Sequence, residues 1–75
     1  MTIEQALINI LDYYGNDLFI QTYDLKELII KELSKVEKRN PMSSTILRSV
    51  RRLRERGYIV KCVSRTKSIY HIYKE

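Results

Sequence analysis

The chain has 75 residues, with one cysteine, one histidine and a formal net charge of +5. This length predicts one domain over residues 1–75 with a small core, and a single cysteine excludes an internal disulfide and a cysteine-based zinc cluster. The sequence holds neither a long apolar run nor a basic signal segment, so we expect no membrane partner and a cytoplasmic or otherwise intracellular location.

Residues 3–14 predict an amphipathic first helix, because their apolar side chains recur at helical spacing. Thr2 and Gln5 make a capping-box pattern at its start, in which each side chain satisfies a free backbone N–H of the other. Gly15–Asn16 is expected to end the helix, since glycine tolerates the left-handed conformation that closes one.

The next segment, residues 18–22, is too short for a helix and rich in strand formers, so it predicts a short strand or an extended linker. A second amphipathic helix is predicted from Asp24 to Lys38, with Asp24 and Glu27 as its capping box. Asn40–Pro41 predicts a turn after it, because proline restricts the residue before it and cannot continue a helix. The next N-cap is either Asn40, with Pro41 as the first helical residue, or one of the serines Ser43–Ser44.

A third helix is predicted over residues 43–56, where Ile46, Val50 and Leu53 recur on one apolar face. Gly57 suits its C-cap, for the same conformational reason as at the end of the first helix. Five of the ten polar residues in this helix are arginines.

Residues 58–63 and 68–73 predict two strands, because β-branched and aromatic residues dominate both. The short polar stretch 64–67 joins them, so the pair should form a β-hairpin. We expect Cys62 to be a buried or half-buried thiol on the first of these strands.

Helix, extended segment, helix, turn, helix and hairpin follow one another in an order that resembles the winged helix-turn-helix superfamily. The resemblance covers nearly the whole chain and rests chiefly on residues 47–59, an amphipathic helix that closes in Leu53-x-x-x-Gly57-aromatic-Ile and runs into a hairpin. Tyr70-x-Ile72 is similar to a returning wing strand. The resemblance implies an α+β fold of three helices followed by a two-stranded β-hairpin wing. The chain departs from the family at residues 34–42, which form a longer turn than usual.

A helical wheel over the third helix separates its arginines into two sets. Arg48, Arg51 and Arg52 lie opposite the apolar face, whereas Arg54 and Arg56 lie at its sides. Arginine pairs bidentately with guanine and neutralises phosphates, and hydroxyls at a helix N-terminus suit phosphate oxygens. In winged-helix proteins the hairpin tip also lies on the minor groove or the backbone. The candidate DNA-binding residues are therefore Ser43, Ser44, Thr45, Arg48, Arg51, Arg52, Arg54, Arg56, Arg65 and Lys67.

Charge distribution supports this interpretation. Residues 1–37 carry three basic and seven acidic side chains, a net of −4, whereas residues 38–75 carry eleven and two, a net of +9. A domain polarised in this way orients in the field of a polyanion. The alternative is a solvated surface in which Glu55 pairs with Arg51 or Arg52. Five arginines in nine residues, with lysine absent among them, favour planar polar recognition instead.

We therefore expect a sequence-specific duplex-DNA-binding protein, a small transcriptional regulator that acts by occupancy in the nucleoid or nucleus. Ile8 and Tyr13 lie off the apolar stripe of the first helix, so a homodimer through this helix is expected to bind a palindromic site. The small size suits a viral or mobile-element protein. No catalytic constellation is present, and we expect no enzyme activity, cofactor, metal or small-molecule ligand.

Two other functions stay open. The first is a winged-helix protein-interaction module whose basic face meets an acidic partner in a larger assembly. The second is binding of RNA or single strands, in which bases stack on aromatic side chains such as Tyr73, which shares a strand face with His71.

Overall fold

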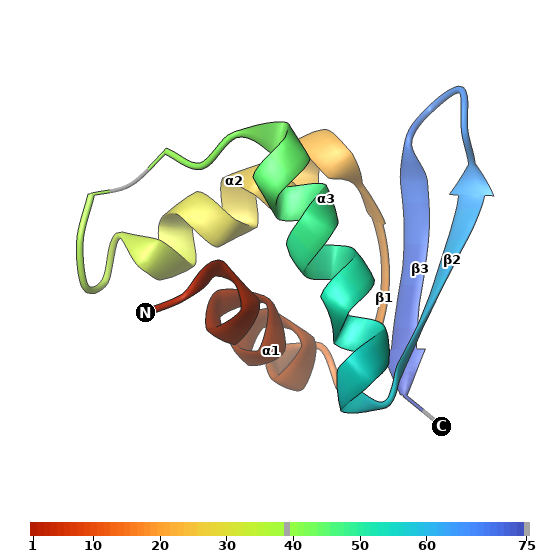
Figure 1. Cartoon of the computed structure of the whole chain (residues 1–75), viewed down its shortest axis with the longest axis horizontal. Helices are drawn as coiled ribbons and strands as arrows, with labels where there is room; N and C mark the ends of the chain where they lie inside the picture. Colours follow the sequence, from red (N-terminus) through yellow and green to blue (C-terminus); the bar gives the residue numbers. More distant parts are fainter. Residues whose placement is uncertain (39, 75) are drawn as a thin grey trace.

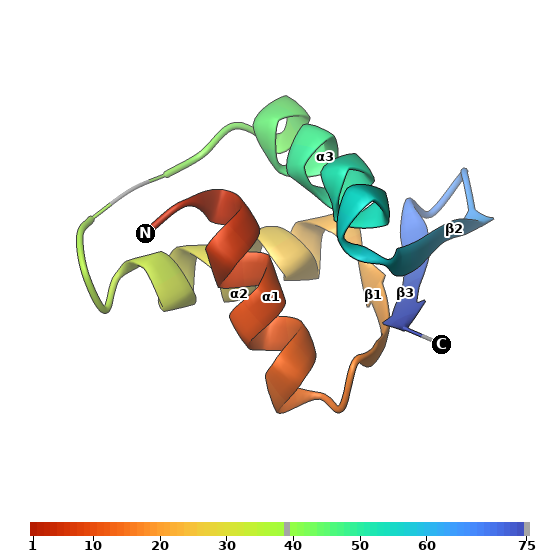
Figure 2. The ribbon, with the colours of Figure 1, turned by 60° about the horizontal axis from the view of Figure 1, so that its bottom comes forward.

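The computed structural model describes residues 1–38 and 40–74. Over these residues the fold is α+β, with three α-helices, one 3-10 turn and a three-stranded antiparallel sheet in the order β1-β3-β2. All three helices lie on one side of the sheet (Figures 1 and 2). The elements are α1 (Ile3–Tyr13), β1 (Asp17–Gln21), α2 (Thr22–Leu33), α3 (Ser43–Arg52), η1 (Leu53–Arg56), β2 (Tyr58–Ser64) and β3 (Ile69–Lys74).

α1 begins and ends close to where its sequence predicts. Thr2 Oγ1 accepts a hydrogen bond from the Gln5 backbone N–H at 3.0 Å, but the Gln5 side chain donates to Asn9 instead of completing the capping box. Gly15 and Asn16 close the helix with φ of +73° and +60°. The turn is tied to the sheet, because the Asn16 carbonyl accepts from the Lys74 N–H at 3.1 Å.

The segment after α1 is a strand, which decides between the two predicted alternatives. β1 pairs with β3 from Asp17–Tyr73 to Gln21–Ile69, so the sheet has three strands and the expectation of a two-stranded hairpin alone was wrong. Alternation turns Leu18 toward the core, where it is buried beside its β3 neighbours.

The predicted bounds of the second helix were wrong at both ends. α2 starts at Thr22, because β1 leads directly into it, and the Thr22 N–H and Oγ1 both donate to the Ser68 carbonyl, at 2.9 and 3.1 Å. Asp24 therefore lies inside the first turn, and the expected capping box with Glu27 does not form; the N-cap residue, Gln21, makes no side-chain cap bond. The helix ends at its last buried residue, Leu33.

The third helix has the predicted extent, but its last turn tightens into the 3-10 turn η1. Both predicted N-caps were wrong: the cap is Met42, in extended conformation, and no side chain caps the helix. The buried ring of Pro41 precedes it. Gly57 follows η1 with φ of +90°, in the left-handed region expected of a C-cap.

The core lies between the three helices and the inner face of the sheet. Ile46, Val50 and Leu53 of the third helix and η1 are each at most 1% exposed, as the wheel predicts. Ile8, expected to be available to a partner, is only partly exposed and packs against this core. The other buried apolar residues are Ile3, Ala6, Leu7, Ile10, Leu11, Leu18, Leu25, Ile29, Leu33, Tyr58, Val60 and Ile72.

Candidate nucleic-acid interface

The exposed face of α3 is held in place by its buried face. Because Ile46 and Val50 are fully packed in the core, the opposite side of the helix must face solvent. Arg48, Arg51 and Arg52 lie there and are exposed. No hydrogen bond or ion pair joins the guanidinium group of any of these arginines to a residue in 1–38 or 40–74.

The start of α3 presents hydroxyl groups that take no part in capping. Ser43 and Ser44 are exposed and Thr45 is half-buried. The first N–H bonded to the preceding segment is that of Ile46, which donates to the Met42 carbonyl at 3.1 Å. The N–H groups and hydroxyls of this first turn lie at the positive end of the helix dipole, and no described side chain caps them.

Arg54 and Arg56 have partners within the chain. The Arg54 guanidinium donates from Nη2 to the Val60 carbonyl at 3.0 Å, which ties η1 to β2. Arg56 Nε donates to Glu4 Oε1 at 2.6 Å, which ties η1 to α1. Their predicted contacts with DNA stay predictions, but both guanidinium groups already stabilise the position of η1.

The hairpin tip is a short turn with its own hydrogen bonds. The Lys67 N–H donates to Ser64 Oγ at 3.3 Å, and the Ser68 N–H donates to the Arg65 carbonyl at 3.2 Å. Ser68 has φ of +52°, a left-handed conformation uncommon for serine, and its carbonyl is the one bonded by Thr22. These bonds fix the base of the tip and leave the Arg65 and Lys67 side chains exposed.

A groove of about 250 Å³ separates α3 and η1 from the hairpin. Arg51 and Arg54 lie on its helical wall, and Arg65, in the turn after β2, lies on the hairpin side, so the groove brings three predicted residues together. The start of α3 and the hairpin tip also lie at the same end of the molecule (Figure 1). The other lining residues are Leu47, Val50, Val60, Cys62 and Tyr70.

Cys62 and Tyr70 are groove residues that the sequence reasoning missed. They are paired across β2 and β3, on the face of the hairpin that turns toward α3. The thiol of Cys62 is exposed, which corrects the expectation of a buried or half-buried group. Strand alternation from the buried Val60 would have placed Cys62 on this face of the hairpin.

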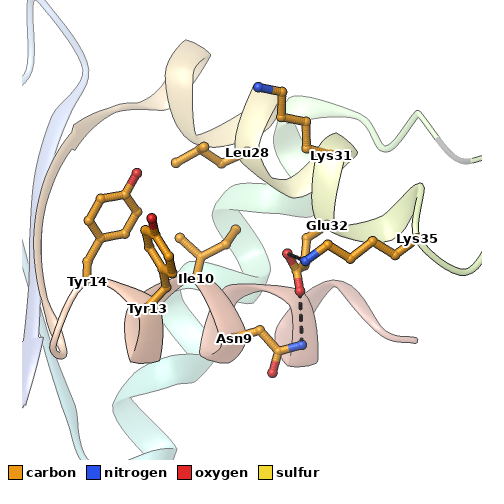
Figure 3. A pocket seen from close by; sticks show the side chains of 8 residues that line it. All are labelled: Asn9, Ile10, Tyr13, Tyr14, Leu28, Lys31, Glu32 and Lys35. Carbon is orange, nitrogen blue, oxygen red and sulfur yellow. Dashed lines mark hydrogen bonds and ion pairs between the residues drawn. The ribbon is translucent and has the colours of Figure 1, made fainter.

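A second hollow lies between α1 and α2, with a volume of about 330 Å³ (Figure 3). Figure 3 shows Tyr13 and Tyr14 at one end of it and Glu32 at the other. Glu32 binds Lys35 at 3.0 Å and accepts a hydrogen bond from Asn9 at 3.4 Å. Unlike α3, this surface has its main charges paired within the chain.

The described residues contain no group of three histidine, cysteine, aspartate or glutamate side chains that is arranged to hold a metal ion. None of the helices in this part of the chain is long and apolar enough to cross a membrane. Comparison of the chain with protein-family models, with curated proteins and with solved structures found no match.

Proposed function

We propose that this chain is a winged helix-turn-helix protein that binds duplex DNA in a sequence-specific way and acts as a small transcriptional regulator. In this proposal α3 enters the major groove and the β2–β3 hairpin is the wing. The observation that carries the proposal is the exposure of Arg48, Arg51 and Arg52 on one helix face, without partners in the described chain.

Unpartnered arginines on a rigid helix are suited to duplex DNA. The major groove admits an α-helix, and a guanidinium can bond guanine O6 and N7 together or neutralise a phosphate. The core contacts of Ile46 and Val50 fix the helix, so its arginines start from a defined backbone position. Binding then orders side chains only, which limits the entropy lost.

The groove beside α3 supports a backbone contact. Arg51 and Arg65 on its opposite walls would approach one phosphate from two sides, while Lys67 at the tip reaches the next stretch of backbone. If about five phosphates are neutralised in total, the logarithm of affinity should fall with the logarithm of salt concentration at a slope of about −4 to −5.

The proposal is tested by fluorescence anisotropy with a labelled mixed-sequence duplex at low salt. The triple variant R48A/R51A/R52A should bind at least ~100-fold more weakly, with a salt slope reduced by about 3, because three cationic contacts are lost. Its thermal unfolding should match that of the unmodified chain, since all three side chains are exposed.

The matched control removes the same charge from another surface. K31A/K35A/K38A changes three exposed lysines at and after the end of α2. We expect its affinity to stay within about threefold of the unmodified chain, through the long-range field alone. Equal loss in both triple variants would mean that net charge, and not the face of α3, drives binding. Absence of duplex binding even at low salt would favour docking onto an acidic protein partner.

Sequence specificity has a separate test. Selection of bound duplexes from a random pool should recover a defined site, and the same variant R48A/R51A/R52A should recover none. Recovery of no site by the unmodified chain would leave a protein that binds DNA only through its backbone.

A further inference from the structure

The face of the sheet that turns away from the helices combines four apolar or aromatic residues with four polar ones, and no described element covers it. Phe19, in the middle of the edge strand β1, is 63% exposed. The strand register places eight residues on this face, because Leu18, Val60 and Ile72 between them point into the core. This outer sheet face consists of Asp17, Phe19, Gln21, Ile59, Lys61, Ile69, His71 and Tyr73.

An ordered stack of rings runs along the outer sheet face. His71 stacks on Phe19 at 3.8 Å between ring centroids and on Tyr73 at 4.3 Å, with interplanar angles of 10° and 25°. Asp17 Oδ1 binds His71 Nε2 at 2.6 Å, and Lys61 Nζ lies 5.7 Å from the centre of the Tyr73 ring. The side chains of the face are therefore fixed by one another before any partner arrives.

The stack argues against single-stranded nucleic acid as the occupant of this face. Proteins that bind single strands stack bases on open ring faces. Here both faces of His71 are covered, and the rings of Phe19 and Tyr73 each use one face on it. Only Phe19 and Tyr73 keep one ring face each outside the stack, so the stack leaves few open ring faces for bases.

We propose that the outer sheet face is the interface of a homodimer, with a second copy of this chain as its occupant. The two copies are related by a two-fold axis parallel to β3. Because β3 is the central strand, this axis lays β1 of each copy against β2 of the other, and every contact is made twice. Sheets commonly pack face to face in this way.

Charge complementarity favours this occupant. β1 carries Asp17 and β2 carries Lys61, and both are exposed. Asp17 pairs with Tyr73 of β3 and Lys61 pairs with His71, two residues away on the same strand. Along the strand direction the two charged residues are therefore offset by one pleat repeat, about 7 Å. A lysine side chain spans that distance, so two Asp17–Lys61 pairs form between the copies, one at each border of the stacked rings.

The dimer would also set the spacing of the two α3 helices on DNA. This consequence rests on the proposed function, whereas the dimer is argued independently of it. Packed sheets lie about 10 Å apart and each helix about 10 Å from its sheet, which places the two α3 helices about 30 Å apart. That distance is close to the ~34 Å between half-sites one turn apart on DNA. An axis along β3 keeps both hairpin tips at the same end (Figure 1), so one duplex meets both basic surfaces.

Analytical ultracentrifugation without DNA tests the dimer. At about 100 µM, above the micromolar Kd expected of a small interface, the chain should sediment at twice its 9.0 kDa. Phe19→Asp should sediment as a monomer. The control is Tyr13→Asp, which adds the same charge at a residue of α1 that is 83% exposed, and this variant should stay dimeric.

A charge exchange tests the proposed pairing itself. Asp17→Lys and Lys61→Asp should each raise the dimer Kd about tenfold, because each turns two attractive pairs into repulsive ones. The double variant should recover most of the lost affinity, although it lacks the bond from Asp17 to His71. Circular dichroism of each variant should show the unmodified fold.

Three outcomes would overturn the proposal. The first is a chain that sediments as a monomer at the highest concentration; binding of oligothymidine by such a monomer, lost in Phe19→Asp, would make single-stranded nucleic acid the occupant instead. The second is a dimer lost in Tyr13→Asp but kept in Phe19→Asp, which would place the interface at the α1–α2 hollow. The third is a double charge variant no better than the single ones. Failure of duplex binding in a chain that still dimerises would count against the proposed function alone.

Discussion

α3 and η1 form one continuous helical segment, yet their arginines occupy different environments. The three on α3 (Arg48, Arg51, Arg52) are exposed and have no partner in the described chain. The two on η1 (Arg54, Arg56) bind the Val60 carbonyl and the Glu4 carboxylate. A single arginine-rich sequence thus divides into a part available to a partner and a part that joins the helix to β2 and α1.

This division follows from the end of the helix. The tightening into η1 and the left-handed Gly57 turn the chain from α3 into β2, so residues 53–56 are close to both β2 and the start of α1. Side chains on α3 itself have the core on one side and solvent on the other. The position along the helix, and not the residue type, decides which arginine is free.

The largest expected effect concerns the α3 side of this comparison. R48K/R51K/R52K keeps the charge but loses the planar fork that pairs bidentately with guanine. Each such pair contributes about 1–3 kcal/mol of discrimination, so the ratio of specific to non-specific affinity should fall at least ~100-fold. The salt slope should stay unchanged.

Anisotropy with the selected duplex and with a mixed-sequence duplex measures both quantities. An unchanged ratio would show that these arginines contact phosphates only, and base contacts would then have to come from elsewhere on α3. The control is K31R/K35R, which makes the reverse exchange at two exposed lysines at and after the end of α2 and should alter neither quantity.

The second prediction concerns the η1 side. Arg54→Ala removes a charged donor from a partly buried carbonyl, and we expect the free energy of unfolding to fall by about 1–2 kcal/mol. Arg52→Ala is the matched control, because Arg52 is exposed and unpartnered; its effect should stay within about 0.5 kcal/mol. Urea denaturation followed by circular dichroism measures both. Equal losses would mean that the Arg54 bond does not stabilise the fold.

Helical spacing explains why most of this organisation was predictable. The apolar periods of α1 and of the third helix fix which face is buried, and the prediction that Arg48, Arg51 and Arg52 are exposed is confirmed. Gly15 and Gly57 mark helix ends because both adopt positive φ. These features depend on neighbours close in sequence, which a single sequence contains.

The features that were missed depend on contacts distant in sequence. The start of α2 is set by bonds from Thr22 to Ser68, which are 46 positions apart. The third strand needs β3 as its partner, and the role of Arg56 needs Glu4 from the other end of the chain. The wheel shows that Arg54 and Arg56 lie at the sides of the helix, but it carries no information on what lies beside them.

The third prediction measures the bond between η1 and α1. A double-mutant cycle of Glu4→Gln and Arg56→Gln should give a coupling energy of about 0.5 kcal/mol, since the Arg56 side chain is 55% exposed and water screens the pair. The coupling should decrease further at ~1 M salt. A coupling of zero at low salt would mean that the Glu4 pair does not hold Arg56, and Arg56 would then be as available to DNA as the arginines of α3.

The smallest expected effect concerns Glu55, which lies in η1 between Arg54 and Arg56. It is exposed, and no ion pair joins it to Arg51 or Arg52 among the described residues, so the alternative in which it neutralises the α3 face lacks support. Glu55→Gln should therefore raise affinity for duplex DNA about twofold at low salt, by removing a charge that repels phosphates, and leave the unfolding free energy unchanged. Glu27→Gln removes the same charge from an exposed residue of α2 and is the control. A loss of affinity confined to the selected sequence would contradict this expectation, because it would make Glu55 an acceptor for cytosine N4 and extend base contact beyond α3 into η1.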